Sequence, residues 1–160
     1  MKLYVMRHGP AEDFAASGLD GDRSLTASGR ERVKLVAKLL RESDEAPRMI
    51  VSSPLVRALQ TAEIIASETC VEHVETSRDL APGGNAHAFV MALAREERKR
   101  VMVVGHEPDL SSLIEALLGG GFGHDMLKAM VVGLAVREDV RLRFVLDPKA
   151  LHIERAANSV

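Results

Sequence analysis

Short apolar runs alternate along the chain with longer segments whose apolar residues recur at helical spacing. Continuous apolar runs predict buried strands at residues 2–6, 49–51 and 101–104. Apolar residues at helical spacing predict helices over 27–42, from Pro54 past Ile65, over 86–97, and from Pro108 to Leu118. Strands and helices that alternate in this way form a mostly parallel sheet with helices on both faces. We therefore predict a three-layer α/β/α sandwich.

The remaining segments predict connections and a closing hairpin. Residues 71–75 predict a weak strand, and Pro82-Gly83-Gly84-Asn85 predicts a turn within 77–85. Residues 130–137 and 140–146 predict a C-terminal antiparallel hairpin around Glu138-Asp139. The tail after Pro148 has no assigned element. With 160 residues and no repeat or linker, we expect one domain over 1–160.

Composition restricts the core and the cellular setting. Aromatic residues make up only 3% of the chain, so the core must be aliphatic. The single cysteine, Cys70, excludes an internal disulfide and a cysteine-based zinc site, and we expect it to be a small buried residue. The longest apolar stretch, Ala129–Val136, is far shorter than the ~20 residues of a spanning helix, and the N-terminus lacks a signal-peptide pattern. We expect a cytoplasmic protein.

The net charge of −2 gives no general attraction to polyanions. We therefore expect neither nucleic acid nor membrane as a partner. No set of His, Asp and Glu has the spacing of metal ligands, so we expect metal-independent chemistry without a cofactor.

Polar residues follow three of the predicted strands. Arg7-His8-Gly9 comes after the first strand, Arg57 follows the second, and His106 follows the run at 101–104. Because parallel strands share one carboxyl edge, these side chains are expected to meet in one pocket. The long polar loop 10–25 carries Arg23, which could fold over the same place.

Two arginines and two histidines in one pocket suit a phosphoryl group. Arginine binds phosphate oxygens in a bidentate manner and stays charged. A histidine among arginines resists protonation, and its neutral ring nitrogen is free to attack phosphorus. Helices that begin at Pro54 and Pro108 would add backbone N–H donors.

Four motifs, in this order, resemble those of the histidine phosphatase superfamily, the phosphoglycerate-mutase-like proteins. They are Met6-Arg7-His8-Gly9-Pro10-Ala11-Glu12, then Arg23-Ser24-Leu25-Thr26 with Gly29, then Ser53-Pro54 with Arg57-Ala58 and Thr61-Ala62, and finally Val104-Gly105-His106-Glu107-Pro108. The absence of a large insertion between Arg57 and His106 resembles the short, SixA-type phosphohistidine phosphatases.

The resemblance implies a role for each matched residue. His8 would be the nucleophile that carries a transient phosphoryl group, and Arg7 and Arg57 would clamp the phosphoryl oxygens. His106 would complete the pocket and stabilise the transition state. Arg23 matches a further arginine near the phosphate in the short branch.

The chain departs from the resemblance at the general acid. Many members carry a glutamate in an inserted region that this chain lacks. Asp79 is the nearest match by position, and Asp13, Asp20 and Asp22 in the first loop are rivals. A phosphorus–nitrogen bond is labile and depends less on a strong acid, which fits a phosphohistidine substrate.

The function implied is a phosphatase that removes the phosphoryl group from phosphohistidine in a protein. One alternative is a phosphatase for small phosphomonoesters such as sugar or nucleotide phosphates. Another is a phosphate-recognition module that has lost turnover. The partner is then a phosphorylated protein or a small phosphorylated molecule, and the absence of long insertions favours a monomer.

Overall fold

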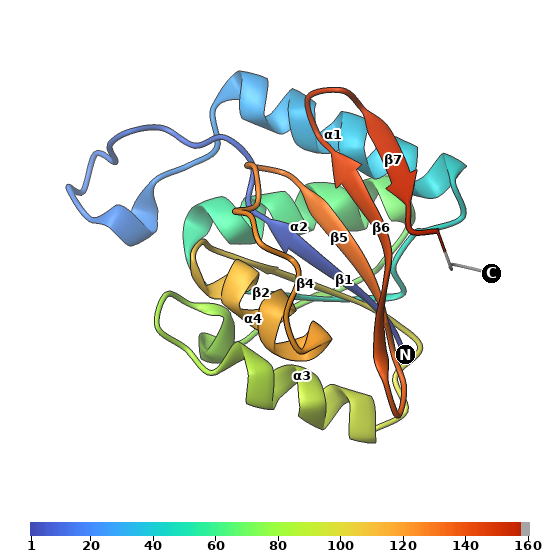
Figure 1. Cartoon of the computed structure of the whole chain (residues 1–160). Helices are drawn as coiled ribbons and strands as arrows, with labels where there is room; N and C mark the ends of the chain where they lie inside the picture. The colour runs from blue at the N-terminus through green and yellow to red at the C-terminus, as the bar shows by residue number, and fades with distance from the viewer. Residues whose placement is uncertain (158–160) are drawn as a thin grey trace.

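A computed structural model of the chain describes residues 1–157 and confirms the three-layer α/β/α architecture (Figure 1). One seven-stranded sheet has the strand order β3-β2-β4-β1-β5-β6-β7. The strands are β1 (Lys2–Arg7), β2 (Met49–Ser52), β3 (Val74–Thr76), β4 (Arg100–Gly105), β5 (Val131–Val136), β6 (Val140–Asp147) and β7 (His152–Arg155). The helices are α1 (Ala27–Glu42), α2 (Val56–Thr69), α3 (Ala86–Arg95) and α4 (Asp109–Leu118). None of these helices is both long and apolar enough to cross a membrane.

Strands β1 to β4 are parallel to one another, and the other half of the sheet is antiparallel. β5 pairs with β1, and the predicted hairpin of β5 and β6 is confirmed. The seventh strand, β7, was not predicted from the sequence. It pairs with the outer edge of β6, and most of its residues are exposed. Its sequence therefore lacks the apolar pattern that reveals a buried strand.

The two helical layers explain why β1 and β4 are continuously apolar. Leu3 and Val5 of β1 belong to the core that α3 and α4 cover, whereas Tyr4 and Met6 belong to the core under α1 and α2. Figure 1 shows these two helix pairs on opposite faces of the sheet. Because successive side chains of a strand point to opposite faces, every buried position of β1, residues 3–6, must be apolar.

Several predicted element ends need correction. Thr26 caps α1 as expected, because its Oγ1 accepts a hydrogen bond from the Gly29 N–H at 2.9 Å. The prediction that the second helix begins at Pro54 is wrong, since α2 begins at Val56. The Ser53 hydroxyl accepts the Leu55 N–H and also bonds to His106, and the chain bends at residues 54 and 55 before the helix begins. Helix α3 ends at Arg95, two residues before the predicted 97.

Cys70 is exposed, and the expectation that it is buried is wrong. It follows the last residue of α2 and adopts a left-handed conformation with φ of 59°. This conformation ends the helix and turns the chain away, so Cys70 lies outside the apolar face of α2.

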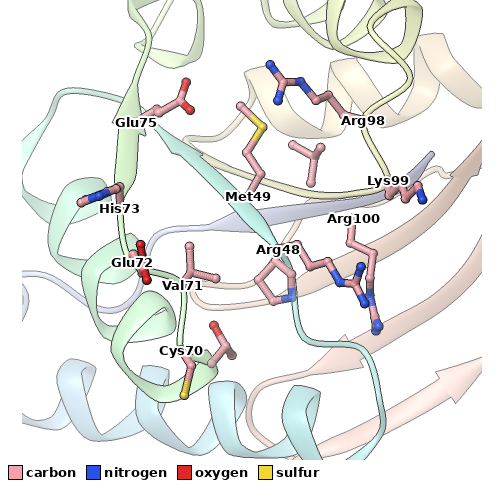
Figure 2. Close-up of a pocket in the computed structure, with 13 residues that line it drawn as sticks. Arg48, Met49, Cys70, Val71, Glu72, His73, Glu75, Arg98, Lys99 and Arg100 are labelled. Atoms are coloured by element: carbon pink, nitrogen blue, oxygen red, sulfur yellow. The ribbon is translucent and has the colours of Figure 1, made fainter.

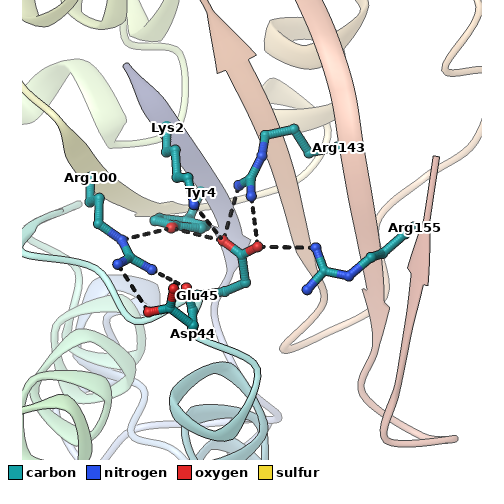
Figure 3. Close-up of polar contacts among 7 residues, drawn as sticks. All are labelled: Lys2, Tyr4, Asp44, Glu45, Arg100, Arg143 and Arg155. Atoms are coloured by element: carbon teal, nitrogen blue, oxygen red, sulfur yellow. Dashed lines mark hydrogen bonds and ion pairs between the residues drawn. The ribbon is translucent and has the colours of Figure 1, made fainter. Parts of the chain in front are cut away.

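A buried carboxylate, Glu45, holds the antiparallel half of the sheet against the rest (Figure 3). Glu45 is only 2% exposed. Arg143 of β6 donates to both carboxylate oxygens at 3.0 and 2.6 Å, and Arg155 of β7 donates to one of them at 3.1 Å. The Tyr4 hydroxyl and the Lys2 ammonium approach from β1. Burial alone would raise the pKa of Glu45, but these cations hold it below its usual value.

Candidate active site

The carboxyl ends of β1, β2 and β4 meet at one rim, as the sequence predicts. In the sheet register Arg7 lies opposite Gly105, and Ser52 lies opposite Val104. Beyond the strand ends, the His8 N–H donates to the Gly105 carbonyl at 3.1 Å. The rim therefore brings together the residue after β1 and the residue after β4, which are His8 and His106.

The hydrogen bonds of His8 define its tautomer. Its Nδ1 lies 2.7 Å from the Gly9 carbonyl oxygen, which can only accept, so Nδ1 carries the proton. Its Nε2 lies 3.3 Å from Nε of Arg57, which can only donate, so Nε2 carries the lone pair. His8 thus presents an unprotonated nitrogen next to a guanidinium group.

His106 and Arg7 complete the group around His8. The two imidazole rings lie 5.2 Å apart between centroids, and Nε2 of His106 is 2.8 Å from the Ser53 hydroxyl. Arg7 donates from Nη1 to the Met126 carbonyl at 2.7 Å. Within residues 1–157, the buried atoms Nε of Arg7 and Nδ1 of His106 have no hydrogen-bond partner. Buried polar atoms without partners are costly, so the site is suited to a ligand that supplies acceptors.

The pKa values of both histidines are lowered, which favours the neutral form of each imidazole. Burial lowers the pKa of His8 to about 3, and the charges of Arg57 and Arg7 add to this effect. Burial, followed by the Arg57 charge, lowers the pKa of His106 to about 4. The sequence predicted the direction from the arginines alone, whereas burial is the larger cause.

We expect the two histidines to make folding stability depend on pH. The unfolded chain protonates histidine near pH 6.5, but the folded chain does so only near pH 4 and 3. The unfolded state therefore binds more protons below pH 6.5, and stability falls as the pH falls through this window. Urea unfolding at pH 7 and pH 5 should show a loss of about 4 kcal/mol in the free energy of unfolding, divided nearly equally between the two histidines. The double variant H8Q/H106Q should lose clearly less, and an equal loss would contradict the assignment.

Gly9 is required by close packing rather than by contact with a ligand. A Cβ at Gly9 would lie 2.6 Å from the Val33 side chain of α1. The Gly9 N–H donates to the Thr61 hydroxyl at 3.0 Å, and that hydroxyl donates to the Arg57 carbonyl at 2.8 Å. Thr61 thereby links the backbones that carry His8 and Arg57, a role that sequence reasoning missed.

Arg57 is held from the 10–25 loop by Asp20. Its Nη1 donates to the Asp20 carbonyl at 2.9 Å, and its Nη2 pairs with the Asp20 carboxylate at 3.1 Å. Arg23 pairs with the other oxygen of that carboxylate at 2.9 Å and donates to the Glu12 carbonyl. Arg23 therefore reaches the site through Asp20 rather than by contact with His8.

The candidate general acids lie in different surroundings. Asp79 is exposed, and its side chain contacts Ser77, which neighbours it in sequence. Asp13 and Asp22 are also exposed, and Asp22 accepts a hydrogen bond from Ser17. Asp20 alone among the four contacts Arg57 within the described residues. The Arg23 guanidinium, together with Arg57, holds the pKa of Asp20 below its usual value.

A separate hollow of about 640 Å³ lies at the opposite end of the sheet (Figure 2). Its walls include Met49 and Arg100, near the amino ends of β2 and β4, and the segment Cys70 to His73. It shares no residue with the His8 group, which lies at the carboxyl ends of the same strands. Across residues 1–157, no group of three or more His, Cys, Asp or Glu could hold a metal ion. Metal-independent chemistry stays a prediction.

Comparisons with known proteins agree with this geometry. The sequence model of the histidine phosphatase superfamily (branch 1) matches residues 3–82, a range that includes Arg7, His8 and Arg57. A protein of unassigned function from Picosynechococcus sp. is 42% identical over 139 residues, which are 84% of each chain. Phosphohistidine phosphatase SixA of Escherichia coli is 32% identical over 126 residues, covering 75% of this chain and 76% of that protein.

The fold agrees as well. A solved structure of the protein histidine phosphatase SixA complexed with tungstate superposes with a TM-score of 0.86 at 26% identity. The superposition covers 95% of this chain and 100% of that chain.

Proposed function

Because the chain belongs to the histidine phosphatase superfamily, we propose that it removes the phosphoryl group from phosphohistidine in a protein, through a transient phosphohistidine on His8. Membership supports a phosphatase, and the substrate and the roles of individual residues are the proposal. The observation that carries it is the unprotonated Nε2 of His8, which lies 3.3 Å from Arg57 in a buried pocket.

In the first step, Nε2 of His8 attacks the phosphorus atom of the substrate. The phosphorus–nitrogen bond of the substrate breaks, its electron pair returns to the imidazole of the substrate, and that ring takes up a proton from solvent so that it leaves as neutral histidine. Arg7 and Arg57 neutralise the charge on the equatorial oxygens, which is the main demand of phosphoryl transfer. A bound phosphoryl group would also supply acceptors for Nε of Arg7 and Nδ1 of His106.

In the second step, a water molecule attacks phosphorus and the bond to Nε2 of His8 breaks. The water loses its proton to solvent, and inorganic phosphate leaves. His8 returns to its starting tautomer because the Gly9 carbonyl keeps the proton on Nδ1.

Asp20 is better suited to pairing with Arg57 than to acting as the general acid. Its lowered pKa keeps the carboxylate ionised, so it has no proton to donate at neutral pH. It occupies the Nη2 donor of Arg57, so an arriving phosphoryl group displaces it from that position. An imidazole leaving group needs less protonation than an alkoxide, which is consistent with a site whose acid is not evident.

The substrate class rests on the relatives. The Escherichia coli relative is a phosphohistidine phosphatase, and the structural relative is a protein histidine phosphatase. Both cover at least three-quarters of this chain. We therefore place phosphohistidine in a protein ahead of small phosphomonoesters.

A substrate panel tests the proposal. We expect kcat/KM for a phosphohistidine peptide to exceed that for phosphoserine peptide and 3-phosphoglycerate by at least about a hundredfold, since cleavage of a phosphorus–nitrogen bond depends less on a general acid than cleavage of an ester does. The measurement is release of inorganic phosphate at pH 7. Faster hydrolysis of 3-phosphoglycerate would support the small-ester alternative, and no turnover of any substrate would support the recognition module.

A further inference from the structure

A second hollow, of about 360 Å³, opens directly beside the phosphoryl pocket. Four chain segments form its walls: the end of β1, helix α1, the turn before β5 and the turn after β6. Its charged lining residues are Arg7, Arg32, Lys128 and Lys149, and its apolar lining residues are Pro10, Leu127 and Pro148. Arg7 belongs to this lining and also to the group around His8, so the hollow adjoins that group.

The protein holds the walls of this hollow in place. Nη1 of Arg32 donates to the Pro148 carbonyl at 2.6 Å, which joins α1 to the turn between β6 and β7. Nη1 of Arg7 donates to the Met126 carbonyl at 2.7 Å, which fixes the turn before β5. The cavity is therefore formed by bonded elements and not by loose side chains.

The lining carries a surplus of positive charge. It contains four cations and no carboxylate. Asp147 precedes Pro148 and is not part of the lining; its Oδ1 accepts the backbone N–H groups of Lys149 and Ala150, and these hydrogen bonds, followed by the charges of Lys149 and Arg32, lower its pKa. Within residues 1–157, Lys128 and Lys149 form no ion pair, although both are exposed. Four lining cations outnumber the single neighbouring carboxylate of Asp147, and such a surplus of positive charge attracts an anionic group.

We propose that this hollow binds the carboxylate of an aspartate or glutamate that flanks the phosphohistidine in the substrate protein. The inference rests on the proposed function and adds a specificity site to it. Lys128 and Lys149 pair with the carboxylate, and Leu127 and the two prolines contact its aliphatic stem. Arg7 lines the hollow and also belongs to the group around His8. An anion in the hollow and the transferred phosphoryl group therefore both lie next to the Arg7 side chain.

Two matched peptides test the subsite. They carry the same phosphohistidine and differ only in an aspartate or an asparagine beside it. We expect the wild-type chain to prefer the aspartate peptide by about fivefold in kcat/KM, which is the scale of a few partly exposed ion pairs. The K128Q/K149Q variant should reduce the preference to less than about twofold. High salt should weaken the wild-type preference, because these charges are exposed.

A charge-matched control separates local contact from general attraction. Lys34 and Lys38 lie on α1 outside the hollow and pair with Glu31 and Glu42. The K34Q/K38Q variant removes the same charge and should keep the fivefold preference. If K34Q/K38Q loses the preference as K128Q/K149Q does, the subsite is overturned in favour of long-range attraction.

The remaining outcomes distinguish the subsite from the function. Equal hydrolysis of both peptides overturns the subsite and leaves the phosphatase proposal intact. No hydrolysis of either peptide is a failure of the proposed function itself. A comparison of 3-phosphoglycerate with glycerol 3-phosphate identifies the source of the anion. A preference for the carboxylate that appears only in this small-molecule pair overturns the assignment to a protein side chain.

Discussion

The H8Q variant is expected to hydrolyse a phosphohistidine peptide at least about 10⁴-fold more slowly than the wild-type chain, because it lacks the attacking nitrogen. Nε2 of His8 is the ring atom with a free lone pair, since Nδ1 is bonded to the Gly9 carbonyl. A glutamine amide can still donate to that carbonyl and fills a similar volume, so we expect the fold to persist. Initial rates of phosphate release at saturating substrate measure the effect.

Labelling separates loss of the nucleophile from loss of the fold. After a brief reaction with radiolabelled phosphohistidine peptide and a quench at alkaline pH, we expect label on the wild-type chain at His8. H8Q should carry none, while H124Q, which changes an exposed histidine, should be labelled like the wild type. Equal urea midpoints would show that H8Q is folded. Label that remained on H8Q would place the intermediate on another residue and contradict the mechanism.

Replacement of Arg57 by glutamine, R57Q, is expected to lower kcat/KM by about 10³-fold. Arg57 donates to Nε2 of His8, and its Nη atoms lie on the loop side of the pocket, where Asp20 now binds them. In the proposed mechanism, the substitution removes a charge that offsets the phosphoryl oxygens in the transition state. Lysine keeps a charge but not the planar fork, so R57K should recover no more than about tenfold of the loss.

Separate kcat and KM values, together with inhibition by vanadate, measure this effect. R57Q should lower kcat and weaken vanadate binding in parallel, since vanadate resembles the transition state. R98Q is the matched control, because Arg98 is exposed and lines the hollow at the other end of the sheet. R57Q activity within threefold of wild type would refute the clamp. Full recovery in R57K would mean that charge alone matters.

Much of the site could be predicted because it lies at the ends of buried strands. The buried positions of β1 and β4, residues 3–6 and 101–104, are all apolar, and this pattern stops just before Arg7, His8 and His106. Parallel strands share one carboxyl edge, so a local pattern was enough to bring these distant residues together. The same reasoning placed Arg57 correctly, although α2 starts two residues later than predicted.

Other features could not be predicted, because they depend on contacts between distant residues with no local pattern. In the sequence Asp20 was one of three loop rivals to Asp79 as the general acid, and only the folded loop shows that it binds Arg57. Glu45 looks like an ordinary residue after a helix, yet it is buried under Arg143 and Arg155. Cys70 was misjudged because its exposure depends on how the chain leaves α2.

By itself, the sequence determined the layered architecture and the phosphatase family. It also determined which side chains lie next to Arg7 and His8. These features depend on strand and helix periodicity and on short motifs, which are local properties. Only the tertiary structure decided which ring nitrogen of His8 is unprotonated. Its free nitrogen depends on the Gly9 carbonyl and the Arg57 guanidinium, and its low pKa depends chiefly on burial under the surrounding elements. The neighbouring arginines predicted a neutral His8 from the sequence, but burial and hydrogen-bond direction arise only when the layers pack together, which is why the free nitrogen could be assigned only from the fold.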